Sequence, residues 1–183
     1  MRKTLLLFVA SALLAASSAR AQEKHTQSKT VPDSINFIWK SVEKDFTRLA
    51  DAMPEDKWTF KPTQGAFTNA RTFAEQIKHV ACANEAWATQ ILKQEQPEHC
   101  DAGGPNPAKS KAEIMAYLRD SFTQMDRAIA SIDVHNLLEP VNGEYWGDNR
   151  LSAATAAVWH ISDHYGQLVE YLRMNGIVPP ASQ

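Results

Sequence analysis

The sequence lacks most of the short motifs that identify a function directly. Only seven of its 183 residues are glycine, and none of them forms a glycine-rich loop that could cradle a phosphate group. It contains no serine-nucleophile elbow and no C-x-x-C-H motif for covalent haem attachment. No internal repeat is present either, which excludes a solenoid. The chemistry of this chain must therefore depend on other residues.

Long apolar runs are also scarce. The one clear run, at residues 5–16, follows a basic start and precedes an A-x-A cleavage pattern at residues 19–21. The pattern predicts a secretory signal peptide over residues 1–21 and a flexible leader over residues 22–31. No later run reaches the about 18 apolar residues that a membrane span requires. We therefore expect a periplasmic or secreted protein that has no membrane contact after signal cleavage.

Positive charge is in short supply. Removing Arg2, Lys3 and Arg20 with the signal peptide from the 19 basic residues leaves 16 against 21 acidic residues, a formal charge of −5. A mildly acidic surface without basic clusters argues against nucleic acid as a partner. We expect an unknown small-molecule substrate instead, and the sequence leaves open whether two copies form a homodimer.

The chain has only two cysteines, Cys82 and Cys100. An exported protein folds where a disulfide can form. Such a bridge requires the chain to turn back until the two Cα atoms lie within about 7 Å of each other. The alternative is two free thiols, in which case Cys82 is either a small buried residue or a rival metal ligand. Spacing alone leaves both alternatives open.

Four stretches carry apolar residues at spacings of three and four, which is typical of amphipathic helices. The expected helices cover roughly residues 34–53, 72–93, 110–132 and 151–174. Asp33 and Ser34 are expected to cap the first helix. Thr72 and Ser110 each precede a glutamate by three residues, the pattern of a capping box. Gly176 suits the left-handed position that closes the last helix.

The segments between these helices are rich in proline and glycine. Residues 54–62 predict an ordered connection in which Trp58 and Phe60 anchor the chain on the bundle. A loop of about fifteen residues between the second and third helices is long enough to cross from one end of a bundle to the other. Residues 142–143 suggest a turn. Together these features predict an all-α fold, a single four-helix bundle over residues 32–183.

The clearest chemical signal is the pair His160 and His164 in the fourth helix. Two histidines four residues apart project from the same face of a helix, about 5 to 6 Å apart, and can close on one metal ion. The residue after His160 is Ile161, where the zinc-protease motif requires a glutamate as general base. The pair therefore indicates a metal without naming a reaction.

His79, on the second helix, is the candidate third ligand. Three protein ligands with an open position are the pattern of a catalytic zinc site. The alternative is that these histidines are hydrogen-bonded core residues. Asp163 is a candidate partner for His160, and Gln167 either orients a substrate or only bridges two helices. The remaining histidines are expected in the leader and in loops: His25, His99 and His135.

Residues 160–167 (HISDHYGQ) and 171–180 (YLRMNGIVPP) resemble the closing helix of the DinB/YfiT-like superfamily. Residues 53–62 and 73–80 resemble its earlier half. The resemblance covers nearly all of the mature chain, and its motifs are specific in combination. It implies a four-helix bundle with up-down-down-up connectivity.

The resemblance also implies a divalent metal, most often zinc or nickel, held by His79, His160 and His164. Characterised members include metal-dependent thiol transferases and a thiol-dependent isomerase, so a metal-dependent hydrolase or thiol transferase is expected. The export signal is a departure, because the small thiols that those transferases use are chiefly cytosolic. A non-catalytic bundle, in which the ion ties two helices together or is sequestered, stays open as the alternative. No catalytic residue is identified.

Overall fold

The computed structural model describes residues 27–141 and 147–183, so the predicted signal peptide, most of the leader and the turn at 142–143 lie outside the described residues. Four long helices dominate the described part: α1 Val31–Ala52, α2 Phe73–Leu92, α3 Lys111–Ala130 and α4 Arg150–Met174. Three single-turn 3-10 helices accompany them: η1 Glu55–Lys57, η2 Cys100–Ala102 and η3 Pro180–Ser182. The described ranges contain no strand, only an isolated bridge between Pro140 and Asn149.

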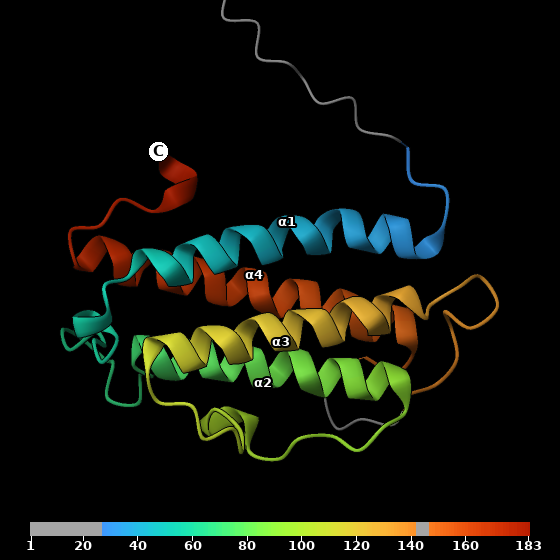
Figure 1. Cartoon of the computed structure of the whole chain (residues 1–183), viewed down its shortest axis with the longest axis horizontal. Helices are drawn as coiled ribbons and strands as arrows, with labels where there is room; N and C mark the ends of the chain where they lie inside the picture. Colours follow the sequence, from blue (N-terminus) through green and yellow to red (C-terminus); the bar gives the residue numbers. More distant parts are fainter. Residues whose placement is uncertain (1–26, 142–146) are drawn as a thin grey trace, which may run out of the picture.

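The connectivity confirms the predicted bundle. Figure 1 shows α1 and α4 running in one direction and α2 and α3 in the other, which is the up-down-down-up arrangement. The loop between α2 and α3 crosses from one end of the bundle to the other and carries η2 on its way. Each helix packs against two others, α1 and α2 both lying against α3 and α4. This places α2 beside α4, and these are the two helices that carry the histidines of interest.

The start of α1 differs from the prediction. Thr30, rather than Asp33 or Ser34, caps the helix: its hydroxyl accepts from the Asp33 N–H, and the Asp33 carboxylate accepts from the Thr30 N–H. Pro32 lies in the first turn, where its missing N–H costs no hydrogen bond and its fixed φ suits a helix. The helix therefore starts before the proline, and Asp33 becomes the third residue of a capping box.

The other helix starts follow the sequence more closely. Thr72 with Glu75 and Ser110 with Glu113 form the two predicted capping boxes. Asn149 caps α4 a little before the predicted start. These caps satisfy the first backbone amides, so the helices that carry the histidines have well-defined beginnings.

The core lies between the four helices and contains large side chains from each of them. Its members include Trp39, Phe46, Phe73, Ile77, Ile91, Leu118, Phe122, Met125, Leu168 and Leu172. Burying one such side chain stabilises the fold by about 1.5 to 3 kcal/mol. Among the described residues, no helix is long and apolar enough to cross a membrane.

The connection between α1 and α2 is anchored as predicted. Trp58 is 4% exposed, and its indole Nε1 donates to the Met53 carbonyl at 2.9 Å. Phe60 is partly buried and meets Tyr171 edge to face, with ring centroids 5.8 Å apart. Both aromatic residues hold the chain at the end of the bundle from which α2 begins.

Candidate metal centre

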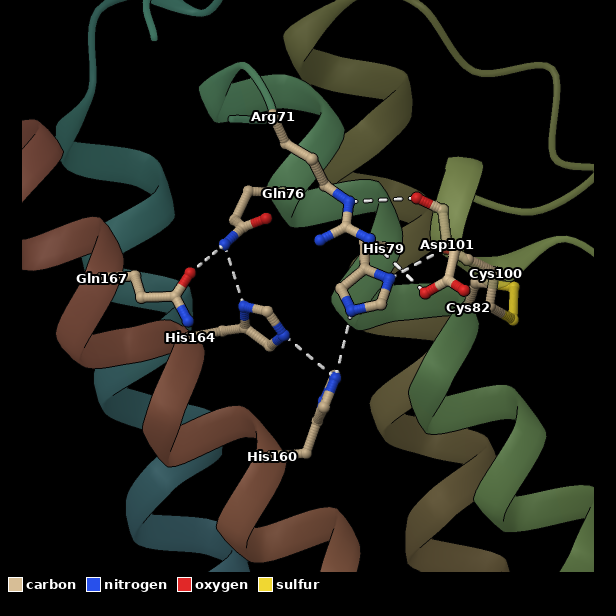
Figure 2. A network of polar contacts seen from close by, with 9 residues as sticks. All are labelled: Arg71, Gln76, His79, Cys82, Cys100, Asp101, His160, His164 and Gln167. Atoms are coloured by element: carbon tan, nitrogen blue, oxygen red, sulfur yellow. Dashed lines mark hydrogen bonds and ion pairs between the residues drawn. A yellow bond between two sulfur atoms is a disulfide. The ribbon is translucent and has the colours of Figure 1, made fainter. Parts of the chain in front are cut away.

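The structure brings the three predicted histidines together between α2 and α4 (Figure 2). His79 Nε2 lies 3.1 Å from His160 Nε2, which lies 3.0 Å from His164 Nε2. Each side chain offers one donor atom, and these atoms all fall within 4.8 Å of one another. No other histidine, cysteine or acidic group of three gathers this closely in the described part of the chain.

The spacing of these nitrogens suits a shared metal ion. Two imidazole nitrogens at about 2.0 to 2.1 Å from one ion lie about 2.8 to 3.4 Å apart, for bond angles between octahedral and tetrahedral values. Two of the three separations, 3.1 and 3.0 Å, lie within that range, and all three donor atoms lie within 4.8 Å of one another. The three side chains are therefore placed to ligate one ion.

The hydrogen bonds around the rings support the same fit. His79 Nδ1 lies 2.9 Å from the Cys100 backbone carbonyl. A carbonyl only accepts, so Nδ1 carries the proton and Nε2 points a lone pair into the cluster. Nδ1 of His160 is buried and has no hydrogen-bond partner among the described residues. His79 thus presents a lone pair to the other two Nε2 atoms, and a cation bound between the rings would be a partner for it.

Electrostatics keep all three rings neutral near pH 7. Burial, together with smaller contributions from the neighbouring imidazoles of His164 and His79, lowers the pKa of His160 to about 2. Burial likewise lowers the pKa of His164 to about 4. The pKa of His79 is lowered by burial too, although its hydrogen bond to Cys100 opposes the shift. Because a histidine must be deprotonated to ligate a metal, these environments favour ligation.

A row of polar side chains extends from His164 toward solvent. Gln76 Nε2 lies 2.9 Å from His164 Nδ1 and donates to Gln167 Oε1 at 2.6 Å. Gln167 Nε2 in turn donates to the Asp163 carboxylate at 2.8 Å. Gln167 therefore bridges α4 to α2, one of its two predicted roles. Asp163 is exposed and accepts from Gln167 rather than bonding to His160.

The cysteines form a disulfide, which decides the alternative that the sequence left open. Cys82 of α2 is bonded to Cys100 of η2, with the two Cα atoms 5.2 Å apart. Cys82 is thereby removed as a rival metal ligand. Cys100 acquires a role that spacing could not reveal, because its backbone carbonyl is the acceptor for His79.

A pocket of about 370 Å³ opens beside the cluster. Besides the three histidines, its lining includes Arg71, Trp87, Asp101, Trp159 and Asp163. The Trp87 and His160 ring centroids are 4.8 Å apart. Arg71 Nε donates to the Asp101 backbone carbonyl at 3.0 Å, and Figure 2 shows the guanidinium close to His79. The cluster is thus open to a small molecule through a wall that combines aromatic rings with one cation.

Several of these neighbours carry no signal in the sequence pattern. Gln76 is 3% exposed and lies among apolar core residues. Its contact with His164 is indicated in the sequence only by a polar amide three residues before His79. Arg71 belongs to the connection before α2 and could not be placed by periodicity. His99 and His135 are exposed, as expected for histidines outside the site. His25 lies outside the described residues.

Comparisons with known proteins agree with this architecture. The family model of the DinB superfamily matches residues 38–168 of this sequence. A solved structure, a DinB-like protein from Bacillus cereus ATCC 10987, superposes with a TM-score of 0.65 at 14% identity. The match covers 84% of this chain and 98% of that one, and at such low identity it shows the fold alone. Among curated proteins, none matches the sequence.

Proposed function

This chain belongs to the DinB superfamily, and we propose that it is an exported, metal-dependent enzyme whose single divalent ion is held by His79, His160 and His164. The observation that carries the proposal is the cluster of three imidazole rings, in which His160 Nε2 lies 3.1 Å from His79 Nε2 and 3.0 Å from His164 Nε2. Imidazole ligands suit zinc, nickel and copper better than magnesium or calcium. Zinc and nickel are the ions we expect.

The reaction we propose is hydrolysis or thiol transfer. A divalent ion supplies Lewis-acid chemistry, which lowers the pKa of a nucleophile such as water or a thiol toward about 7. Three neutral ligands leave the charge of the ion uncompensated, so the site favours anionic groups. Arg71 adds a further positive charge to the pocket wall. We therefore expect the substrate to be a small molecule that carries a thiolate or carboxylate.

The pocket wall offers groups for orientation and proton transfer. Trp87 and Trp159 provide aromatic surface for the apolar part of a substrate. Asp101 is paired with Arg71, whose Nη2 lies 3.5 Å from its carboxylate. Asp163 also lines the pocket and is not paired with a cation in the described part of the chain. Its carboxylate is the group we propose to accept a proton from the nucleophile.

Two features support export to the periplasm or the exterior. Residues 1–21 have the pattern of a signal peptide. The disulfide between Cys82 and Cys100 is the kind of bond that persists in oxidising compartments and is rare in the cytosol. The substrate is then a molecule that reaches this compartment.

Elemental analysis of protein purified without an affinity tag tests the metal site. We expect about one zinc or nickel ion per chain, and loss of that ion in His79→Ala, His160→Ala and His164→Ala. The exposed His135→Ala is the matched control and should retain the metal. Metal retained by the triple histidine variant would overturn the proposal.

A second measurement separates catalysis from a structural role. Because the ligands come from α2 and α4, an ion could also act only as a tie between these helices. Turnover of a thiol or ester panel that is lost on chelation supports the enzyme. A large fall in melting temperature on chelation, without any turnover, would replace it with the non-catalytic bundle.

A further inference from the structure

The disulfide lies directly behind one of the three histidines. Cys82 is three residues after His79 on α2, so the two side chains lie on the same side of the helix. Its partner Cys100 is the first residue of η2. The backbone carbonyl of the same Cys100 accepts a hydrogen bond from His79 Nδ1 at 2.9 Å (Figure 2). One residue is thus bonded to α2 through sulfur and holds His79 through oxygen.

This carbonyl determines what His79 can do. With Nδ1 protonated and bonded to oxygen, Nε2 must present its lone pair to His160 and His164. The hydrogen bond also fixes the plane of the ring. Such outer partners of metal-ligating histidines typically change metal affinity by about 10- to 100-fold when they are removed.

The helix that carries the carbonyl is a single turn, and the disulfide ties it to α2. η2 has three residues, and it is flanked by backbone in the left-handed region at His99 (φ 58°) and Gly103 (φ 88°). The disulfide is its covalent attachment to α2, and the two cysteines are 0% and 3% exposed. Arg71 makes a further attachment through the Asp101 carbonyl, but this contact lies at the surface.

We propose that the Cys82–Cys100 disulfide is a positioning element of the metal centre: it holds the Cys100 carbonyl on His79, and opening it weakens metal binding. This inference rests on the metal site proposed above. Reduction by glutathione would break the S–S bond and give two protein thiols, while two glutathione molecules lose two protons and two electrons and join as their disulfide. In an exported protein the metal centre is then complete only after the bridge has formed in the oxidising compartment.

Zinc affinity, measured by competition with a chromophoric chelator, tests the inference. The Cys82→Ala/Cys100→Ala variant removes the bridge without leaving thiols that could bind zinc themselves. We expect it to bind zinc about 10- to 100-fold more weakly than the oxidised wild type. Met125→Ala, in the buried core of α3, is the control for general destabilisation and should keep the wild-type affinity.

A second measurement uses only the wild type, and so does not depend on the folding of a variant. If the disulfide strengthens zinc binding, zinc must stabilise the disulfide by the same factor. In a glutathione redox buffer, alkylation and mass spectrometry should show the equilibrium shifted about 10- to 100-fold toward the bridge when zinc is present. A disulfide that only stabilises the fold, without contact to the site, would not respond to zinc in the folded protein.

The outcomes separate this inference from the proposed function. Equal zinc affinity with and without the bridge, or a redox equilibrium that zinc leaves unchanged, would overturn the inference and leave the metal site intact. A wild type that binds no zinc or nickel would overturn both.

Discussion

On the α2 side of the cluster, His79 donates to a backbone carbonyl whose own residue is covalently tied to the helix. On the α4 side, His160 Nδ1 is buried without a partner in the described ranges, and His164 Nδ1 contacts the side-chain amide of Gln76. The backbone carbonyl allows only one tautomer of the His79 ring. The tautomer of His164 depends on the orientation of the Gln76 amide, and no partner at Nδ1 fixes the tautomer of His160. The α2 half of the site is therefore fixed before a ligand arrives, and the α4 half can adjust.

The Gln76 amide shows how that adjustment could work. Its Nε2 lies against His164 Nδ1, while its Oε1 is buried and has no partner among the described residues. His164 presents a lone pair at Nε2 only when Nδ1 keeps its proton, which requires an acceptor on Gln76. Rotating the amide by half a turn supplies that acceptor. Gln167 and Asp163 are exposed and can follow the rotation.

The largest loss of unfolding free energy is expected from Gly104→Ala, which disturbs the disulfide on the α2 side of the cluster. Gly104 has φ +71°, and an added Cβ would lie 2.4 Å from Cys82 Sγ. Backbone strain and displacement of the disulfide together should cost about 3 to 5 kcal/mol of unfolding free energy. Urea denaturation measures this.

The matched control for that substitution is Gly176→Ala. Gly176 has the same φ of +71°, but nothing lies within 4 Å of the added Cβ. Only the strain remains, about 1 to 2 kcal/mol. Equal losses at the two glycines would show that contact with the disulfide is unimportant.

The unfolding free energy of the metal-free protein should depend on pH through the buried histidines, and the α2 and α4 sides of the cluster should differ in this dependence. The folded-state pKa values of His160 and His164 are lowered to about 2 and about 4, against 6.5 for unfolded chains. The unfolded state then binds more protons, so stability is present above pH 6.5 and is lost as the pH falls below it. Each histidine contributes a slope of up to about 1.4 kcal/mol per pH unit.

The two halves should contribute unequally to this slope. The hydrogen bond to Cys100 opposes the effect of burial at His79, whereas His160 has no such bond. His160→Ala should therefore flatten the pH dependence of urea stability more than His79→Ala does. The reverse order would contradict the assignment of the fixed ring to α2.

The adjustable half is tested by Gln76→Leu, which keeps the volume and removes the amide. Zinc affinity should fall about 10-fold, because His164 loses the partner that fixes its tautomer. Stability of the metal-free protein should fall by about 1 to 3 kcal/mol, because the buried Nδ1 of His164 loses its hydrogen-bond partner. Competition titration measures the change in affinity, and urea denaturation measures the change in stability.

Gln90→Leu provides the comparison for this substitution. Gln90 lies on the same helix, is 1% exposed, and also has a buried Oε1 without a partner in the described part of the chain. Its Nε2 donates to the Gly147 carbonyl, away from the cluster. Gln90→Leu should leave zinc affinity unchanged. A tenfold loss of affinity in Gln90→Leu would contradict the proposal that Gln76 acts through its contact with His164.

The sequence predicts those parts of the fold and the site that depend on residues close together in the chain. It does not predict the contacts that distant loops make with the site. The four helices follow from apolar periodicity and capping boxes, and His160 with His164 follows from helical spacing, because all of these depend on residues close in the chain. His79 required the bundle and the family resemblance. The Cys100 carbonyl could not be predicted, because any residue has one and only the path of the loop selects it. The Thr30 cap differs from the expected start because the first turn of a helix tolerates Pro32, whose missing N–H has no partner there in any case.

The smallest effect on metal binding is expected at the solvent end of the α4 half, with Asp163→Asn. Asp163 is exposed, and its hydrogen bonds connect it to His164 through Gln167 and Gln76. Zinc affinity should change by no more than about twofold, because an exposed polar contact contributes little. Turnover, if Asp163 accepts the proton from the nucleophile, should fall about 10²- to 10⁴-fold with the metal still bound. A variant that loses metal and activity together would instead make Asp163 part of the support of His164, and the α4 half would then be as fixed as the α2 half.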